Sequence, residues 1–302
     1  MEFKVGADSD GILLRSYLKK ISLSNKLVAH LKAVEGGITV NGDNVTVRYT
    51  LKSGDILRLA IEDTESSDSI APVDLPLDII YEDEDTVVCN KPPFMPTHPS
   101  HNHFDDTLAN ALAFYYSGKP FVFRPVNRLD RNTSGTVLIA KNARAAGILF
   151  SEMKKRNIEK TYLSVTEGEF SGSGIIEKHM CRTEASIIVR RVCDENETGA
   201  QYAKTEYEVL ECGNGLSLVR LKPLTGRTHQ LRVHLASIGH PILGDDIYGN
   251  VSEIIARQAL HAESLIFSRP SDGKRIEVKA PLPNDIEKAV RHINTDQFSE
   301  KI

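Results

Sequence analysis

The first sixty residues alternate between helical and strand-like spacing of apolar side chains. Leu13–Leu18 and Leu23–Val34 carry apolar residues at helical intervals, and Ser24 is suited to cap the second helix. The stretch GGITVNGDNVTVRYTLKSGDILRLAI then alternates apolar and polar residues, with an Asn-Gly-Asp turn and a Gly-Asp turn. The pattern predicts two short helices followed by a few short strands.

The rest of the chain mixes strands and helices without a regular βαβ alternation. Strands are predicted at Thr86–Cys89, Val137–Ala140, Ser186–Val192, Ala203–Cys212 and Leu216–Leu221, and helices at Asn142–Lys155, His229–Ile238 and Asn284–Ile293. No internal repeat is visible. Such grouping is typical of an α+β architecture.

An acidic segment separates these two parts. The formal net charge of the chain is −4, but ten acidic and no basic residues fall between Glu62 and Asp85. Residues 1–61 hold nine Lys/Arg against six Asp/Glu, so an anionic partner is compatible with the rest of the chain. Because serines, prolines and carboxylates cannot bury a core, we expect an exposed linker at 64–77, between domains at 1–63 and 78–302.

The stretch RPVNRLDRNTSGTVLIAK, from Arg124 to Lys141, carries the first candidate chemistry. It sets Asp130 beside Arg128 and Arg131, just before a turn of small residues and an apolar run. Neighbouring guanidinium groups favour the ionised carboxylate. A salt-bridged turn that enters a strand would show the same pattern, so the stretch alone leaves both interpretations open.

A second stretch, LTGRTHQLRVHLASIGHPILGDDIYG, follows about a hundred residues later. In its predicted helix, Arg232 lies one turn after His229 and one turn before Ala236. Arginine holds a carboxylate in fixed geometry through two parallel hydrogen bonds and does not lose its proton. Arg232 is therefore a candidate partner for a catalytic carboxylate.

These stretches resemble the RluA/RluD family of RNA pseudouridine synthases. RLDRNTSG, KTY, TGRTHQLRVHLASIGHPILGD and RQALHA occur in the family's order, between about Asp78 and Pro283. The resemblance implies a pseudouridine-synthase fold with a mixed, mostly antiparallel central sheet and the active cleft across its middle. The pattern of two helices, G-I-T-V-N-G and G-D-I-L near the N-terminus resembles the S4-type α/β RNA-binding domain, over about Asp10–Ile61.

Residue by residue, the resemblance implies that Asp130 is the catalytic residue, Arg232 its ion-pair partner and Tyr162 the aromatic that packs on the target base. Arg131 would help to extrude that base. The residue before RLD is usually His in the family and is Asn127 here, which casts doubt on an acid–base role at this position. RNA contacts are expected from Arg128, Arg131, Arg227 and Lys160, and from Arg15, Lys19 and Lys26 in the first domain.

Pseudouridine formation breaks the bond between uracil N1 and the ribose and joins C5 to the same sugar carbon. This isomerisation needs a carboxylate and an enclosed pocket that retains the detached uracil. It needs neither a metal nor an organic cofactor. The chain has no G-x-x-x-x-G-K-[ST], no G-x-G-x-x-G after a strand and no H-E-x-x-H. His98, His101 and His103 are interpreted as a polar loop rather than a metal site, and His261 as structural.

Composition bounds the remaining expectations. Apolar residues make up 40% and charged residues 26%, as in ordinary soluble proteins, and no long apolar run or signal peptide is visible. We expect a cytoplasmic monomer with no membrane association. Four cysteines lack C-x-x-C spacing and are interpreted as reduced and structural: Cys89, Cys181, Cys193 and Cys212.

The sequence hypothesis is an RNA pseudouridine synthase that acts on structured RNA, with 23S ribosomal RNA as the expected substrate and tRNA as the alternative. A non-catalytic RNA-binding ribosome-assembly factor on the same fold is a second interpretation. A hydrolase that uses Asp130 to release free uracil is a third. Which uridine is modified is not encoded in a readable motif, because that choice depends on RNA shape.

Overall fold

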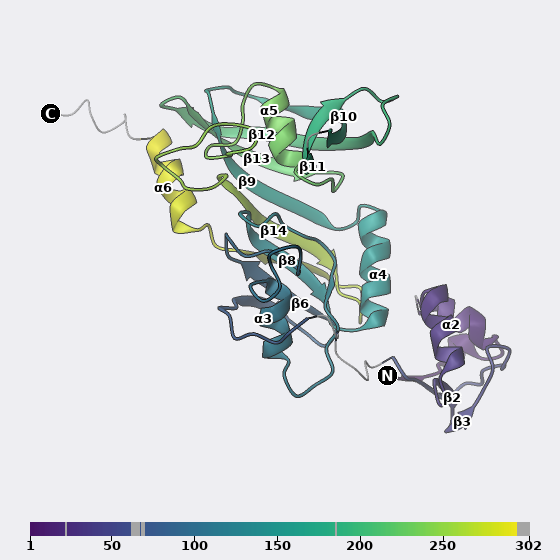
Figure 1. The fold of residues 1–302 in the computed structure, drawn as a ribbon. Helices are drawn as coiled ribbons and strands as arrows, with labels where there is room; N and C mark the ends of the chain where they lie inside the picture. Colours follow the sequence, from purple (N-terminus) through teal and green to yellow (C-terminus); the bar gives the residue numbers. More distant parts are fainter. Residues whose placement is uncertain (22, 62–66, 68–69, 185, 295–302) are drawn as a thin grey trace.

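The computed structural model describes residues 1–21, 23–61, 67, 70–184 and 186–294 (Figure 1). In the N-terminal part, four short strands form an antiparallel sheet in the order β1-β4-β2-β3, beside two helices. These elements are β1 (Glu2–Lys4), η1 (Ala7–Ser9), α1 (Leu14–Lys20), α2 (Asn25–Ala33), β2 (Ile38–Val40), β3 (Asp43–Asn44) and β4 (Ile56–Leu59).

The predicted helices and strands of this part are confirmed. Ser24 caps α2 by accepting a hydrogen bond from the backbone NH of Leu27 at 3.2 Å. Buried leucines from the helices and the sheet, such as Leu18 and Leu57, form one core. The sheet also takes in β1, an N-terminal strand that the apolar pattern did not reveal.

The larger part of the chain is built on one long sheet. Its strands run in the order β11-β10-β12-β13-β9-β14-β8-β6-β5, with β15 beside β14 and β7 beside β8. The strands are β5 (Ile79–Glu82), β6 (Thr86–Lys91), β7 (Arg124–Pro125), β8 (Ser134–Ala140), β9 (Glu159–Glu167), β10 (Ser173–Thr183), β11 (Ser186–Cys193), β12 (Gln201–Gly213), β13 (Leu216–Pro223), β14 (Leu260–Ser268) and β15 (Arg275–Lys279). Among the described strands only β8 and β14 pair in parallel, so the predicted mixed, mostly antiparallel sheet is confirmed.

Within the described residues, four helices accompany this sheet: α3 (Leu108–Tyr115), α4 (Ala143–Lys154), α5 (Gln230–Ser237) and α6 (Asn284–Ile293). Figure 1 shows α5 and α6 beside one half of the sheet and α3 and α4 beside the other. The helices predicted from apolar spacing are confirmed to within a residue at most ends. None of the helices in the described ranges is long and apolar enough to traverse a bilayer.

The parallel contact between β8 and β14 brings distant segments together at the centre of the sheet. Gly135 opens this contact with φ of 111°, and a Cβ atom there would lie 2.2 Å from the carbonyl oxygen of Ala262. Only glycine fits such a close backbone approach. The loop that carries Asp130 immediately precedes β8, while Tyr162 lies on β9, which pairs with β14 in antiparallel fashion.

The acidic segment differs in part from the exposed linker expected at 64–77. Leu75 and Leu77 pack against the main core of the sheet. The Val73 NH donates to the Asn110 carbonyl at 3.2 Å, and the Asn110 side chain donates to the Ala71 carbonyl at 2.8 Å. Leu75 and Leu77 thus anchor residues 70–77 to the core, and the hydrogen bonds of Asn110 anchor them to α3. Residues 62–66, 68 and 69 lie outside the described ranges.

Candidate active site

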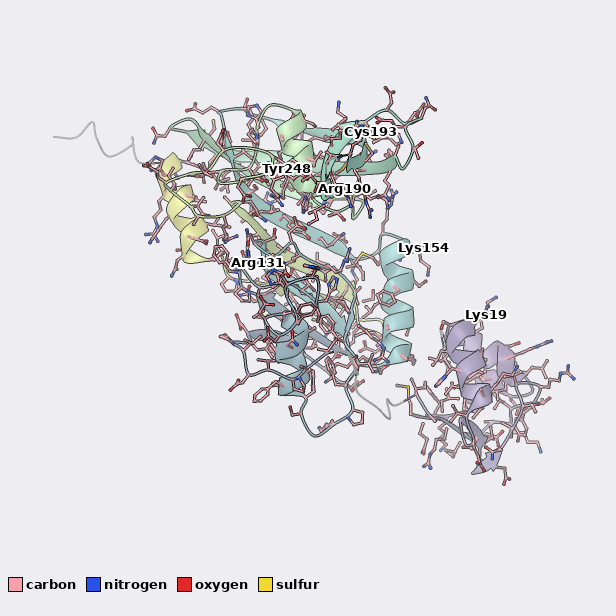
Figure 2. All side chains as sticks on the ribbon, viewed as in Figure 1. Lys19, Arg131, Lys154, Arg190, Cys193 and Tyr248 are labelled. Atoms are coloured by element: carbon pink, nitrogen blue, oxygen red, sulfur yellow. The ribbon has the colours of Figure 1, made fainter. Side chains whose placement is uncertain are left out.

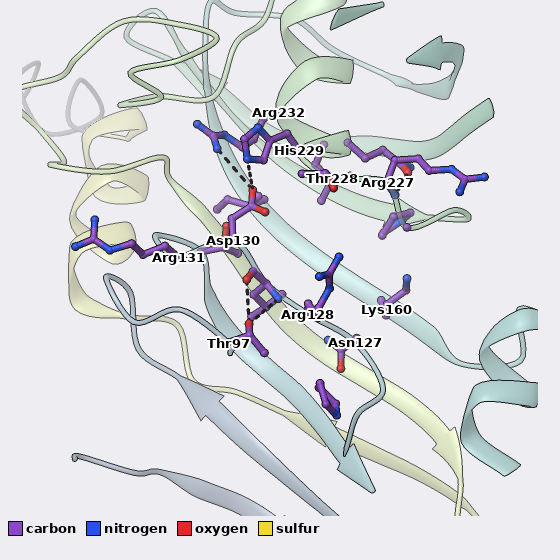
Figure 3. A pocket seen from close by; sticks show the side chains of 18 of the residues that line it. Thr97, Asn127, Arg128, Asp130, Arg131, Lys160, Arg227, Thr228, His229 and Arg232 are labelled. Carbon is purple, nitrogen blue, oxygen red and sulfur yellow. Dashed lines mark hydrogen bonds and ion pairs between the residues drawn. The ribbon is translucent and has the colours of Figure 1, made fainter. Parts of the chain in front are cut away.

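A cavity of about 560 Å³ lies over the middle of the sheet, between the loop before β8, strand β9 and the start of α5 (Figure 3). Its lining includes the cavity residues predicted from sequence: Arg128, Asp130, Arg131, Lys160, Tyr162, Arg227 and Arg232. Among the described residues that line it, Asp130 is the only carboxylate. One acid therefore faces several cations, and its side chain retains 28% exposure to the cavity.

The loop around Asp130 is held by polar contacts on both sides. Thr97 accepts from the Leu129 NH at 3.2 Å and donates to the Leu129 carbonyl at 3.0 Å. The Asp130 carbonyl accepts from the Thr133 NH at 3.1 Å, which closes the turn. Gln258 donates to the Thr133 hydroxyl at 3.3 Å. These contacts fix the backbone from which the carboxylate projects.

Two buried cations lie behind the same loop. The Lys91 ammonium donates to the carbonyls of Met95 at 2.7 Å and Arg131 at 3.1 Å, and burial lowers its pKa to about 7. Arg257 donates to the Asn132 carbonyl at 2.9 Å. Both side chains pin carbonyl oxygens next to Asp130, so a shift of the loop would break hydrogen bonds inside the core.

Arg232 approaches Asp130 from α5, but its closest partner is another acid. Its Nε and Nη2 atoms form a bidentate pair with the fully buried Asp245, at 2.7 and 2.6 Å. The third nitrogen, Nη1, lies 3.6 Å from Asp130 Oδ2. Arg232 therefore lies next to Asp130, as predicted, but its contact with Asp130 is longer than its contacts with Asp245. Asp245 orients the guanidinium group, and the Nη1 atom faces Asp130.

The charge of Arg232 is secure in this position. Burial disfavours the charged form, but hydrogen bonds to Asp245 and the negative charges of Asp245 and Asp130 outweigh it and raise the pKa of Arg232. Asp245 is itself satisfied, since its Oδ1 also accepts from the NH groups of Ile247 at 3.0 Å and Tyr248 at 3.1 Å. The result is a fixed positive edge beside the cavity carboxylate.

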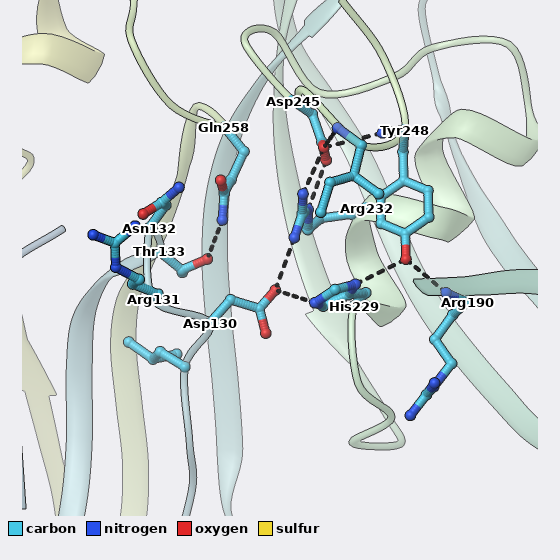
Figure 4. A network of polar contacts seen from close by, with 12 residues as sticks. Asp130, Arg131, Asn132, Thr133, Arg190, His229, Arg232, Asp245, Tyr248 and Gln258 are labelled. Carbon is cyan, nitrogen blue, oxygen red and sulfur yellow. Dashed lines mark hydrogen bonds and ion pairs between the residues drawn. The ribbon is translucent and has the colours of Figure 1, made fainter. Parts of the chain in front are cut away.

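His229 and Tyr248 complete this network, and sequence reasoning missed both (Figure 4). His229 Nε2 lies 4.0 Å from Asp130 Oδ2, and Nδ1 lies 2.8 Å from the Tyr248 hydroxyl. That hydroxyl accepts from the Arg190 NH at 2.8 Å, so its own proton is free for His229 Nδ1. The Nε2 atom then carries the imidazole proton toward Asp130. Burial lowers the pKa of His229.

Tyr162 lies on the floor of the cavity with 8% of its surface exposed. Burial and the nearby charge of Asp130 raise the pKa of its phenol. The hydroxyl therefore stays protonated at neutral pH, and the ring offers a flat surface beside the carboxylate.

The cations expected to contact RNA divide between the cavity and the N-terminal part. Arg128, Arg131 and Arg227 are exposed at the cavity rim, whereas Lys160 is half-buried and its pKa is lowered by burial. Arg15 and Lys19 are exposed on α1, and Lys19 is labelled in Figure 2. Lys26 belongs to α2, but its side chain lies outside the described part.

Asn127, which replaces the usual His of the resembled family, has a structural role. Its side chain donates to the Thr136 carbonyl at 3.1 Å and accepts from the Leu138 NH at 2.8 Å. Both polar groups of the amide are thus used to hold the loop against β8. This explains why an amide is tolerated there and leaves no group for proton transfer.

The histidines interpreted as structural or as a polar loop do not gather around a common point. His98 and His103 both line the cavity, and His103 pairs with Asp106 at 2.6 Å. His261 is fully buried, contacts Ser134 at 2.9 Å and has its pKa lowered to about 4 by burial. Its structural role is as expected. His234 is buried, and its Nδ1 atom lies 2.9 Å from the Thr205 hydroxyl.

A family model described as RNA pseudouridylate synthase matches residues 85–237, which include Asp130, Tyr162 and Arg232. The chain belongs to this family. It is therefore an isomerase of the class that converts uridine in RNA to pseudouridine, and RNA is its substrate class.

Relatives match the synthase over most of its length. The uncharacterized RNA pseudouridine synthase YjbO of Bacillus subtilis is 36% identical over 93% of this chain and 99% of its own. Ribosomal large subunit pseudouridine synthase D of Vibrio cholerae is 36% identical over 84% of this chain and 82% of its own. The solved structure of human RNA Pseudouridylate Synthase Domain Containing 1 is 32% identical, with a TM-score of 0.57, over 72% of this chain and 95% of that one.

Proposed function

We propose that this synthase modifies uridines in 23S ribosomal RNA and that Asp130 is the residue that performs the chemistry. The observation that carries the second part is the single carboxylate of the described cavity lining, set against an arginine edge at 3.6 Å. The similarity to the large-subunit synthase of Vibrio cholerae supports the first part. The proposed setting is a cytoplasmic monomer.

Asp130 would act as nucleophile or base while the N1–C1′ bond of uridine breaks and the C5–C1′ bond forms. The base gains a proton at N1 and loses the one at C5, so nothing is added overall. Arg232 keeps the carboxylate charged and oriented. Tyr162 packs on the freed uracil and takes part in proton transfer at C5 through its hydroxyl.

The target base must leave its stack before it reaches Asp130. Extrusion costs a few kcal/mol, and stacking on one aromatic ring returns about 1–3 kcal/mol. Tyr162 supplies that ring, and Arg131, exposed at the rim, would help to displace the base. Arg128, Arg227 and Lys160 line the cavity, and in this proposal they contact the flanking phosphates.

The N-terminal part is proposed as an S4-like RNA-binding domain that uses Arg15, Lys19 and Lys26. Each phosphate contact adds about 0.7–0.9 to the slope of log affinity against log salt. Removal of residues 1–65 should therefore weaken RNA binding and flatten its salt dependence. An unchanged slope would show that these helices do not contact RNA.

The activity and target are tested by product analysis. The protein is incubated with 23S ribosomal RNA and, in parallel, with tRNA, both transcribed without modifications, and the digested nucleosides are separated by chromatography. Pseudouridine in the ribosomal RNA with no released uracil is expected. Free uracil would identify a hydrolase, pseudouridine in tRNA alone would move the target, and RNA binding without product would favour the assembly-factor interpretation.

A further inference from the structure

The hairpin formed by β10 and β11 brings together two cysteines that are well separated in sequence. In the register of the hairpin, His179 is opposite Cys193 and Cys181 is opposite Arg191. Because residues two apart in a strand share a face, all four side chains lie on one side of the hairpin. Cys181 is buried and Cys193 half-buried; Figure 2 labels Cys193 near the end of the sheet that carries α5.

Glu197, from the turn after β11, closes over the two thiols. One ligand atom from each of Cys181, Cys193 and Glu197 lies within 4.8 Å of the others, and the Cys181 sulfur is 4.0 Å from Glu197 Oε2. A tetrahedral zinc ion takes sulfur at about 2.3 Å and carboxylate oxygen at about 2.0–2.2 Å. Those bond lengths place neighbouring ligands roughly 3.5–3.8 Å apart, so small side-chain movements would bring all three onto one ion.

A disulfide fits this register less well than a shared ion. Cys181 and Cys193 are diagonal neighbours rather than directly opposite residues. Diagonal Cα atoms in an antiparallel pair are about 7–8 Å apart, whereas disulfides span about 4.4–6.8 Å. An ion between the two sulfurs bridges the larger separation without moving the strands.

The surrounding charges match a bound dication. Two thiolates, one carboxylate and Zn²⁺ sum to a single negative charge, and Arg191 is paired with Glu197 through its guanidinium. His179, directly across from Cys193, lines the same surface pocket as Cys193 and Glu197. Its ring packs edge-on against Tyr202 and lies outside the group of ligand atoms within 4.8 Å of one another, so a water molecule would fill the fourth position of a tetrahedral ion.

We propose that the β10–β11 hairpin binds a thiophilic divalent cation, Zn²⁺ in particular, through Cys181, Cys193 and Glu197, with water in the fourth position. The site is separate from the catalytic cavity and supplies no step of the isomerisation. Its consequence is mechanical, because the Arg190 NH on β11 donates to the Tyr248 hydroxyl. A metal that stiffens the hairpin would steady the network behind Asp130.

Proton release gives the site a second signature. Cysteine binds a metal ion as the thiolate, so both thiols must lose their protons on binding. Metal binding therefore releases protons and weakens as the pH falls. A surface carboxylate site would show far less of this dependence.

The test is a Co²⁺ titration of the metal-stripped full chain, followed by absorption. We expect one equivalent to bind, with an intense ultraviolet sulfur-to-cobalt band and visible bands of tetrahedral cobalt, both removed by Zn²⁺. Cys181→Ser and Cys193→Ser should abolish the ultraviolet band, and Glu197→Gln should weaken binding at least about tenfold. Cys212→Ser, an exposed cysteine on β12, is the matched control and should titrate like the wild type.

Two results would overturn the proposal. One is the lack of a stoichiometric sulfur–cobalt band in the wild type, or its persistence in Cys193→Ser with a wild-type circular dichroism spectrum. The other is a reduced, metal-stripped chain that oxidises to a Cys181–Cys193 disulfide, seen by peptide mass, without taking up cobalt when reduced again. Glu197→Gln changes an exposed turn, so it reports on binding even if a cysteine variant folds poorly.

Discussion

Arg232 and Arg257 are both buried arginines that form a fork with an aspartate, but only one of them faces the cavity. Arg232 pairs with Asp245 at 2.7 and 2.6 Å, and Arg257 pairs with Asp285 at 2.7 and 3.0 Å. Arg257 Nη1 also donates to three backbone carbonyls, those of Asn132, Gln258 and Leu260. The corresponding Nη1 of Arg232 points to Asp130 at 3.6 Å.

The difference separates a structural guanidinium from a functional one. The hydrogen-bonding capacity of Arg257 is used within the protein, where it ties the loop before β8 to β14 and α6. Arg232 keeps one donor edge for the cavity while Asp245 holds the other two nitrogens. The same residue type, equally buried, thus serves the fold in one place and the proposed chemistry in the other.

Of the two arginines, Arg232 should show the larger loss of activity when it is replaced by lysine. A lysine can remain near Asp245 but cannot contact two acids with a rigid fork, and a displacement of about 1 Å at a catalytic group costs on the order of 100-fold in rate. We expect a single-turnover rate at least about 100-fold lower, with RNA affinity unchanged. The free energy of unfolding should fall by only about 1–2 kcal/mol, because Asp245 keeps its two backbone NH donors.

Arg257→Lys should reverse this pattern. The substitution breaks several hydrogen bonds from a fully buried side chain and leaves the Asn132 carbonyl unpaired, so the free energy of unfolding should fall by about 2–4 kcal/mol. Denaturant titration measures this loss. The rate per folded molecule should stay within about tenfold of wild type. A stable, inactive Arg257→Lys would erase the distinction between the two arginines.

The smallest of these effects is expected in the pH dependence of unfolding, through the histidine that lies next to Arg257. His261 touches Ser134, which also accepts from Arg257, and burial lowers its pKa to about 4, below the ordinary value near 6.5. Between these values the unfolded chain binds a proton that the folded chain does not, so stability present above pH 6.5 is lost as the pH falls toward 4. The slope of the unfolding free energy against pH reports how many more protons the unfolded chain binds than the folded chain. His261→Gln should lower that number by up to one between pH 4 and 6.5. An unchanged slope would mean that His261 is not buried as a neutral ring.

Much of the fold could be predicted because local patterns and the family motifs agreed. Apolar spacing predicted α4, α6 and β12 to within one or two residues at each end. The family motifs RLD and TGRTHQLR predicted that Asp130 and Arg232 lie together, and both line one cavity. Asp245 and Tyr248 belong to the sequence GDDIYG, which was part of the second family motif. No local pattern in that sequence shows that Asp245 orients Arg232 on α5. The Cys181–Cys193 pair was hidden likewise, because the register of a hairpin decides which residues meet.

Anchoring of residues 70–77 was missed for a related reason. Prolines and acids dominate the composition there and predict an exposed segment, yet Leu75 and Leu77 are enough to dock it against the core. Composition reports an average over a segment, whereas docking depends on a few apolar positions and on backbone partners such as Asn110.

The most direct test of the account is Asp130→Asn under single-turnover conditions. The amide keeps the size of the side chain but is a poor nucleophile and a poor base. Pseudouridine formation should be abolished in this variant, while RNA affinity and the free energy of unfolding stay close to wild type. Substantial turnover by Asp130→Asn, measured as pseudouridine in the digested RNA, would contradict it.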